Sequence, residues 1–166
     1  MVGTVYWLTG LSGAGKTTIG KLLYQEICKQ KNNVVFLDGD TLRQVFGDDL
    51  GYSPEDRLKS AMRNARLCKM LTEQGLDVVC CTISMFDSVR EWNRENIPGY
   101  VEIYVKVSMK TLQERDQKGL YTNSDGSVAG INFAVEEPKK PDLILENDGA
   151  LAPEEQVAKI KELIMK

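Results

Sequence analysis

The segment Gly10–Thr17, with the sequence GLSGAGKT, constrains the fold more than any other part of this 166-residue chain. It has the spacing G-x-x-x-x-G-K-[ST], in which a glycine-rich turn lets backbone N–H groups converge on phosphate oxygens. Residues 5–9 before it form an apolar run typical of a buried strand, and residues 17–30 after it carry apolar side chains at helical spacing. The sequence therefore predicts a strand, a phosphate-binding loop and a helix whose N-terminus faces the phosphates.

Two side chains of this loop carry specific chemistry. Lys16 can place its ammonium group on the β- and γ-phosphates of a nucleoside triphosphate, and the hydroxyl of Thr17 is a ligand for Mg²⁺. The loop glycines supply backbone conformations that other residues rarely adopt. The predicted phosphate-binding residues are Gly10, Ser12, Gly13, Ala14, Gly15, Lys16, Thr17 and Thr18.

The rest of the chain alternates strand-like and helical segments. Apolar runs at 34–38, 76–82, 100–107 and 143–146 are separated by segments with helical periodicity. This alternation predicts an α/β fold in which helices cover both faces of a parallel sheet. Because no repeat or composition shift divides the sequence, we expect one domain over residues 1–166.

Asp38 and Asp40 follow the second predicted strand directly. Ligands of open parallel sheets bind beyond the carboxyl ends of the strands, so we expect both carboxylates to face magnesium or a substrate hydroxyl. The alternative is a turn in which an aspartate caps a helix over 41–46, a role that Asp40 alone could fill. The chain has no histidine, so any general base must be a carboxylate.

Composition and cysteine usage restrict the class of protein. The net charge is −3 and no basic stripe is present, which does not suggest a nucleic-acid partner. No secretion signal and no apolar run of membrane-spanning length occur, so we expect a cytoplasmic protein without a membrane partner. Cysteines 28, 68, 80 and 81 form no C-x-x-C pair and are interpreted as small core residues of a reducing compartment, with a redox switch as the alternative.

Three further features leave alternatives open. Arg57 lies at the start of a helix beside an acidic loop, where it is either a solvated surface residue or a contact for an anionic substrate. Met85 and Phe86 follow the third strand and are either core residues or the wall of a base or sugar pocket. Residues 115–130 combine cations with Gly, Ser, Asn and Asp, as in a lid that closes over phosphates or in a plain surface loop.

Taken in order, these segments resemble adenylylsulfate kinases, which phosphorylate the 3′-hydroxyl of adenosine 5′-phosphosulfate. The resemblance implies a P-loop NTPase fold, a doubly wound three-layer α/β/α structure with a five-stranded parallel sheet. It also implies ATP as co-substrate, Mg²⁺ as cofactor and a small nucleotide as acceptor. The matching segments are 10–18, 37–43 (LDGDTLR), 49–57 (DLGYSPEDR), 115–121 (RDQKGLY) and 138–141 (PKKP).

The resemblance also implies roles for individual residues. Lys16, Asp38 and Asp40 would be catalytic, with Asp38 orienting or deprotonating the attacking hydroxyl and binding the metal together with Thr17. Arg115 and Lys118 would cover the ATP phosphates. Members of the family are often homodimers. The expected acceptor-binding residues are Asp40, Arg43, Arg57, Ser60, Ile83, Ser84, Met85, Phe86, Lys118, Leu120 and Phe133.

Departures from the family pattern fall on the acceptor side. Ser60 stands where the family usually has Asn, Met62 where it often has Arg, and residues 83–87 read ISMFD in place of I-S-P-[YF]-R. Residues 130–133 are shorter than the family's G-F-T-G-I-D-D-P segment, which carries a base-stacking Phe. The ISMF variant resembles relatives found with capsule-modification enzymes, whose acceptor is cytidine diphosphoramidate.

Two acceptors therefore compete at the level of sequence. Adenosine 5′-phosphosulfate, in sulfate assimilation, follows from the family, and cytidine diphosphoramidate, in capsule biosynthesis, follows from the departures. An alternative from another class is a nucleotide-dependent switch or binding module, but the N-K-x-D base motif of GTPase switches does not occur.

Overall fold

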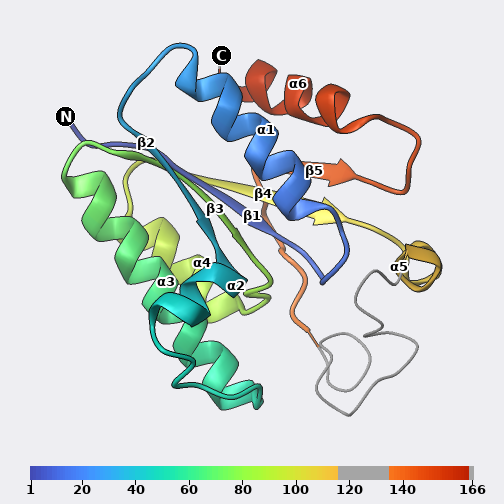
Figure 1. Cartoon of the computed structure of the whole chain (residues 1–166), viewed down its shortest axis with the longest axis horizontal. Helices are drawn as coiled ribbons and strands as arrows, with labels where there is room; N and C mark the ends of the chain where they lie inside the picture. Colours follow the sequence, from blue (N-terminus) through green and yellow to red (C-terminus); the bar gives the residue numbers. More distant parts are fainter. Residues whose placement is uncertain (116–134, 165–166) are drawn as a thin grey trace.

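A single parallel sheet organises the molecule (Figure 1). The computed structural model describes residues 1–115 and 135–164, and the statements below concern these residues. All neighbouring strands pair in parallel, which confirms the predicted α/β class. The strand order is β2-β3-β1-β4-β5. The strands are β1 (Val5–Thr9), β2 (Val34–Asp38), β3 (Asp77–Thr82), β4 (Tyr100–Lys106) and β5 (Leu143–Glu146).

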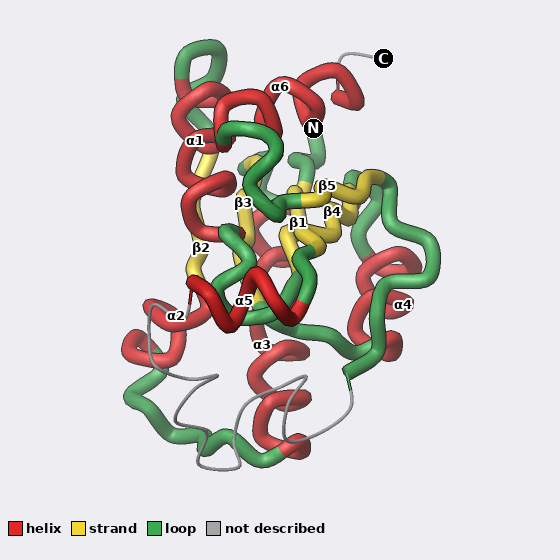
Figure 2. Tube along the Cα trace, turned by 90° about the vertical axis from the view of Figure 1, so that its right-hand side faces the viewer, coloured by secondary structure: helices red, strands yellow, loops and turns green. Residues whose placement is uncertain are grey.

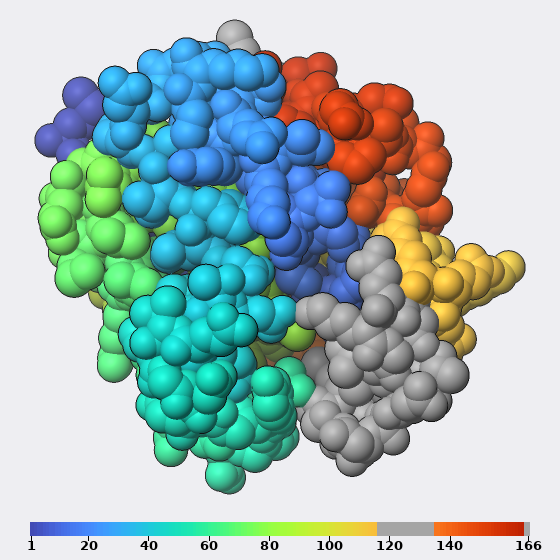
Figure 3. All heavy atoms as spheres, viewed as in Figure 1, coloured from blue at the N-terminus to red at the C-terminus, as the bar shows by residue number. Residues whose placement is uncertain are grey.

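Helices cover both faces of this sheet, as expected for a doubly wound fold. Helices α1 (Lys16–Cys28) and α6 (Pro153–Ile164) lie together on one face, while α3 (Pro54–Glu73) and α4 (Asp87–Asn96) lie on the other (Figures 1 and 2). Two short helices, α2 (Gly39–Val45) and α5 (Met109–Arg115), follow the carboxyl ends of β2 and β4. In the space-filling view α1 and α6 form a continuous surface, and α2 with the loop after it forms a separate lobe (Figure 3).

The two faces have separate hydrophobic cores because neighbouring strand residues point to opposite sides. Leu8 and Cys81 belong to the core under α1 and α6, whereas Trp7 and Cys80 belong to the core under α3 and α4. The adjacent residues Cys80 and Cys81 therefore face opposite sides of the sheet. The interpretation of all the cysteines as core residues is wrong for Cys28, which is exposed at the end of α1.

Two glycines bring α1 and the loop before it close to the sheet. A Cβ atom at Gly20 would lie 2.2 Å from Sγ of Cys81, and one at Gly10 would lie 2.4 Å from the carbonyl oxygen of Val105. Neither position has room for a side chain, so glycine allows the loop to pass directly over the ends of the central strands. None of the described helices combines the length and the apolar composition needed to cross a membrane.

Candidate active site

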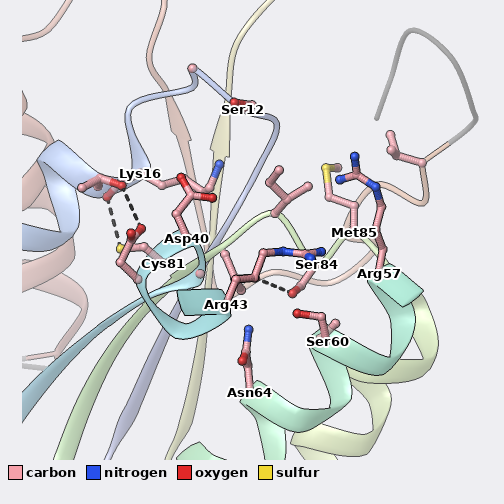
Figure 4. Close-up of a pocket in the computed structure, with 18 of the residues that line it drawn as sticks. Ser12, Lys16, Asp40, Arg43, Arg57, Ser60, Asn64, Cys81, Ser84 and Met85 are labelled. Carbon is pink, nitrogen blue, oxygen red and sulfur yellow. Dashed lines mark hydrogen bonds between the residues drawn. The ribbon is translucent and has the colours of Figure 1, made fainter. Parts of the chain in front are cut away.

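A cavity of about 210 Å³ opens at the carboxyl ends of β1, β2 and β3 (Figure 4). This is the edge of a parallel sheet at which ligands are expected. Its lining comes from the loop before α1, from the start of α2, from one side of α3, from the segment after β3 and from Val135. Residues separated widely in sequence are therefore brought to one site.

The loop 10–17 forms a curved backbone cradle around one end of the cavity. Gly13 and Gly15 have φ angles of 82° and 98°, a left-handed conformation that favours glycine. Nζ of Lys16 donates hydrogen bonds of 2.8 Å to the carbonyl oxygens of Gly10 and Leu11, so the ammonium group lies inside the curve of the loop. Gly15 is the N-cap of α1 and makes no side-chain cap hydrogen bond, so the backbone N–H groups at the start of this helix are presented at the loop. This geometry suits a phosphate chain.

Asn147, the residue after β5, braces this loop from behind. Its Nδ2 donates to the carbonyl oxygen of Ala14 at 2.8 Å, and a Cβ atom at Gly15 would lie 2.5 Å from the same nitrogen. Gln156 on α6 holds the other end of the amide by donating to Oδ1 of Asn147 at 3.4 Å. Sequence reasoning missed Asn147, although a polar residue directly after the last strand is a usable signal for a site residue.

Arg115 joins the same brace. Its guanidinium group donates to the carbonyl oxygens of Gly13 and Asn147, and it does not line the cavity. The structure therefore places Arg115 behind the phosphate loop, in contact with its backbone. The expectation that Arg115 covers the phosphates stays a prediction.

Asp38 and Asp40 both line the cavity but differ in their surroundings. Asp38 is the N-cap of α2: its Oδ2 accepts from the N–H and the hydroxyl of Thr41, each at 3.3 Å, and its Oδ1 accepts from the hydroxyl of Thr17 at 3.4 Å. Asp40 is exposed and lies in the first turn of α2. The alternative that Asp40 alone caps this helix is wrong, because α2 begins two residues earlier than predicted.

The Thr17 hydroxyl and the Asp38 carboxylate present two oxygen ligands side by side. Mg²⁺ prefers oxygen ligands and is usually bound by one or two carboxylates together with substrate phosphates. No group of three or more metal-binding side chains occurs among the described residues, and a site of this type does not need one. The donor set therefore fits the expected ion.

One stripe of α3 forms the opposite wall. Arg57, Ser60, Ala61 and Asn64 are spaced at i, i+3, i+4 and i+7, so they lie on the same side of the helix and all line the cavity. The helix begins after its N-cap Ser53, whose hydroxyl accepts from the N–H of Asp56 at 3.1 Å. The stripe becomes more buried along the helix and ends at Asn64, which is only 3% exposed.

Two arginine side chains lie close together beside this wall. The guanidinium carbon of Arg43 lies 4.4 Å from the ring centre of Tyr52, and that of Arg57 lies 5.3 Å from the same ring. Burial lowers the pKa of Arg57, and the neighbouring charge of Arg43 lowers it further. Nη1 of Arg43 also donates to the carbonyl oxygens of Leu50 and Gly51, which holds the loop before α3 in place. The arrangement suits an anionic group.

The segment after β3 closes the third side. Ser84 has a φ angle of 29°, and its hydroxyl lies 2.6 Å from that of Thr82. The hydroxyl of Thr9 donates to the carbonyl oxygen of Ile83 at 2.6 Å, which ties this segment to the end of β1. Met85 is buried and lines the cavity beside Phe86. Both side chains thus face the cavity, and Phe86 also packs against the core.

Asp87, which stands where the family has Arg, belongs to a clamp on the chain that follows Val135. Burial pushes the pKa of Asp87 upwards, but hydrogen bonds from Arg90 at 2.6 Å and Lys139 at 3.0 Å outweigh this and hold it below its usual value. Arg90 also donates to the carbonyl oxygen of Glu136. The backbone after Val135 is thereby fixed to α4.

Buried thiols near the site are not reactive groups. The Sγ of Cys81 donates to the carbonyl oxygen of Lys16 at 3.3 Å, and burial raises the pKa of this thiol to about 12. The hydrogen bond with Cys68 and, after it, burial raise the pKa of Cys80 as well. Neutral thiols are poor nucleophiles, so the redox-switch alternative finds no support at these positions.

Most of the predicted residues surround one cavity. Gly10 and Ala14 belong to the loop without lining it, and Lys118, Leu120 and Phe133 lie outside the described residues. The predicted residues that line it are Ser12, Gly13, Gly15, Lys16, Thr17, Thr18, Asp38, Asp40, Arg43, Arg57, Ser60, Ile83, Ser84, Met85 and Phe86. The lining residues that sequence reasoning missed are Gly39, Tyr52, Ala61, Asn64, Cys81, Thr82 and Val135.

A phosphate cradle facing a wall of arginines matches what comparison with known proteins finds. The model of the adenylylsulphate kinase family matches residues 2–146. The chain belongs to this family. A kinase of this kind uses ATP to phosphorylate a nucleotide, so family membership favours the enzyme prediction over a switch or binding module.

Individual relatives of this kinase carry two different names. A cytidine diphosphoramidate kinase of Campylobacter jejuni is 39% identical, and the match covers 98% of this chain and 94% of the relative. An adenylyl-sulfate kinase of Halothermothrix orenii is 36% identical, over 98% of this chain and 89% of the relative. The structure of the Mycobacterium tuberculosis APS kinase in complex with AMPPNP and APS superposes with a TM-score of 0.90, at 28% identity and 99% coverage of both chains.

Proposed function

We propose that this kinase transfers the γ-phosphate of ATP to the 3′-hydroxyl of cytidine diphosphoramidate, as a step of capsule biosynthesis. One observation carries the proposal: two of the positions at which the chain departs from the usual family pattern, Ser60 and Met85, line the acceptor side of the cavity, while the phosphate loop keeps its pattern. A kinase that acts on the usual acceptor would have no reason to change the residues that line the acceptor side of the cavity. The name of the Campylobacter jejuni relative, which matches almost end to end, supports the same acceptor.

The proposed reaction assigns a task to each part of the site. The loop N–H groups and Lys16 bind the β- and γ-phosphates. Thr17 and Asp38 would hold Mg²⁺, which would supply positive charge to neutralise those phosphates. Asp38 orients the acceptor hydroxyl and accepts its proton as the oxygen bonds to the γ-phosphorus. The bond between the γ-phosphorus and the bridging oxygen breaks, and ADP leaves. Asp40, Arg43 and Arg57 position the acceptor.

This assignment needs no strong base. Phosphoryl transfer depends mainly on positioning and on charge neutralisation, with little bond formation to the attacking oxygen at the transition state. A carboxylate within reach of the hydroxyl is sufficient, which agrees with a chain that has no histidine. The contact between Asp38 and Thr17 supports a shared role for these two residues at the transferred phosphate.

Adenosine 5′-phosphosulfate is the second candidate acceptor, in sulfate assimilation. The family model and the similarity to a structure solved with APS favour it. Both candidates are nucleotides with a charged 5′-anhydride, so the paired arginines Arg43 and Arg57 suit either one. They differ in the base and in the group at the end of the anhydride.

A panel of acceptors separates the candidates. The purified protein is incubated with ATP, Mg²⁺ and either cytidine diphosphoramidate or adenosine 5′-phosphosulfate, and ADP formation is measured against acceptor concentration. We expect kcat/KM for the cytidine compound to exceed that for the adenosine compound by about 10-fold or more. Efficient turnover of adenosine 5′-phosphosulfate alone would overturn the proposal.

We extend the proposal to the form in which the kinase acts. Residues 1–166 are proposed to fold as one domain, to form a homodimer and to act in the cytoplasm on a small nucleotide, with no nucleic-acid or membrane partner. A related APS kinase from Thiobacillus denitrificans, 29% of whose chain is covered by the match, is described as hexameric, so the assembly of this chain has to be measured. Light scattering of the purified protein tests the dimer, and a mass of about 19 kDa, that of one chain, would contradict it.

A further inference from the structure

Asn64 has an unusual position for a polar side chain. It is 3% exposed, lies on α3 and lines the cavity. Its side-chain amide forms no hydrogen bond with any residue in the described ranges 1–115 and 135–164. Its amide atoms are not among the fully enclosed polar atoms that lack a partner, so the amide keeps its access to the cavity, where water or a ligand can reach it. An amide that faces a cavity under these conditions is expected to bind a ligand there.

The sequence around Asn64 supports a role in binding the acceptor. Members of the family usually have Asn at the position of Ser60, and this chain instead has Asn four residues later. Residues four apart lie on the same side of a helix, about 6 Å apart along its axis. An amide is therefore still presented to the acceptor, but one helical turn further along α3, towards the buried end of the cavity.

Other polar side chains share the cavity with Asn64. Figure 4 draws Asn64 and Ser60 on α3 below Arg43, on the side away from Met85. The hydroxyl pair of Thr82 and Ser84 also lines the cavity, and one hydroxyl of this pair must accept from the other. The apolar wall at Met85 suits a base, while the region near Arg43 suits the charged 5′-anhydride. An acceptor bound with its base at Met85 and its anhydride at Arg43 would have its terminal group on the side of Asn64.

We propose that Asn64 is a specificity-determining residue that hydrogen-bonds the terminal group of the acceptor's 5′-anhydride and selects an amidated phosphate over a fully oxygenated one. This inference rests on the proposed function. It adds which residue distinguishes the end of the acceptor and which chemical group that residue recognises.

The chemistry of the two partners matches. An asparagine amide has a carbonyl oxygen that accepts hydrogen bonds and an NH₂ group that donates them. A terminal phosphoramidate likewise has an NH₂ group that donates and an oxygen that accepts, so both halves of the Asn64 amide are satisfied. A terminal sulfate or phosphate offers oxygen acceptors alone, which leaves the carbonyl oxygen of Asn64 without a partner at a buried position.

Two acceptors that differ in one group test this inference. Cytidine diphosphoramidate and cytidine diphosphate have the same base and sugar and differ by NH₂ against O⁻ at the end of the chain. The ratio of their kcat/KM values is measured for the wild type and for Asn64→Leu, which is similar in size and cannot form hydrogen bonds. We expect the wild type to favour the amidated acceptor and Asn64→Leu to lower the ratio by about 10-fold, with KM for ATP unchanged.

Two further variants provide a second test and a control. Asn64→Ala leaves space instead of an apolar group and should lower the ratio in the same direction. Thr72→Val is the matched control, because Thr72 is a buried polar residue two turns later on α3, bonds the carbonyl oxygen of Lys69 and does not line the cavity. It should leave the ratio unchanged. Melting temperatures identify any variant that fails to fold.

The outcomes separate this inference from the proposed function. If the wild type phosphorylates cytidine diphosphoramidate but both Asn64 variants keep the wild-type ratio, Asn64 does not read the terminal group, and the proposed function stands. If the wild type phosphorylates neither cytidine compound, both proposals fail together. Loss of activity towards both acceptors by the same factor also overturns the inference, because it indicates a general positioning role.

Discussion

The two ends of the cavity are held together in different ways. The phosphate loop is fixed through its own backbone: Asn147 and Arg115 bind its carbonyl oxygens, and the glycines leave no room for side chains. The acceptor wall instead presents side chains from one face of α3, with Arg57 and Asn64 at its two ends. A substitution on that face changes the ligand contacts while the helix backbone stays in place. The comparison explains how one family can keep its ATP site and vary its acceptor.

The largest effect is expected at the phosphate loop. Lys16→Ala should lower kcat/KM by about 10³-fold for every acceptor, because the ammonium group neutralises charge on the transferred phosphate. Steady-state kinetics with each acceptor measures this. Lys21→Ala, which removes an exposed lysine further along α1, is the control and should keep wild-type rates. If the loss of kcat/KM in Lys16→Ala depended on the acceptor, the phosphate loop and the acceptor wall would not have separate roles.

Asp38 lies where the two ends meet, and its substitution tests whether it acts on the hydroxyl. Asp38→Asn should lower kcat by about 10²-fold. Asn is also a good N-cap, so α2 and the melting temperature should be preserved. Asp48→Asn, in the loop after α2 and outside the cavity lining, is the control. A wild-type kcat in Asp38→Asn would remove Asp38 from the mechanism.

Substitution of Asn147 tests how the phosphate loop is held in place, because Asn147 contacts the loop and does not line the cavity. Asn147→Ala leaves the carbonyl oxygen of Ala14 without its donor, which should cost about 1–3 kcal/mol of unfolding free energy. We expect KM for ATP to rise and KM for the acceptor to stay constant. Denaturant unfolding and kinetics at saturating acceptor provide the two measurements. A rise confined to the acceptor KM would contradict the proposed brace.

Ser60→Asn tests the opposite wall by restoring the usual family residue. It should raise kcat/KM for adenosine 5′-phosphosulfate several-fold, with an upper limit of about 10-fold, and leave KM for ATP unchanged. Lys59→Asn, at an exposed neighbouring position outside the cavity lining, is the control. If both variants change KM for ATP, the phosphate loop and the acceptor wall do not act independently.

The smallest effect is expected at the clamp behind the acceptor wall. Because the pKa of Asp87 is lowered in the folded state, its contribution to stability is present above its unfolded pKa and is lost as pH falls through the folded pKa. Asp87→Asn should therefore lower the melting temperature at neutral pH, and the difference from wild type should shrink below about pH 4. Glu95→Gln, at another exposed position of α4, is the control. A pH-independent difference would assign the effect to packing.

Local sequence determined what could be predicted. The glycine spacing of the phosphate loop specifies its conformation directly, and strands without alternation indicated a sheet covered on both faces, as found. The start of α2 was placed too late because two aspartates compete for the same cap and the sequence does not rank them.

Long-range contacts explain what could not be predicted. Asn147 braces Ala14 across 133 residues, and no local pattern links the two. The sequence places Asn64 on a helix, but only the folded structure shows that this residue lines the cavity. Cys28 is the last residue of α1, and its side chain is exposed there.

The shared ring of Tyr52 has a consequence for how the kinase responds to its substrates. Arg43 and Arg57 approach one aromatic side chain, and each raises the electrostatic cost of the other. A doubly charged nucleotide entering between them relieves that repulsion, so it should rigidify residues 47–57 even before ATP arrives. We expect the acceptor alone to slow amide hydrogen exchange in this segment. Such slowing would show that the acceptor orders its own side of the site before ATP binds.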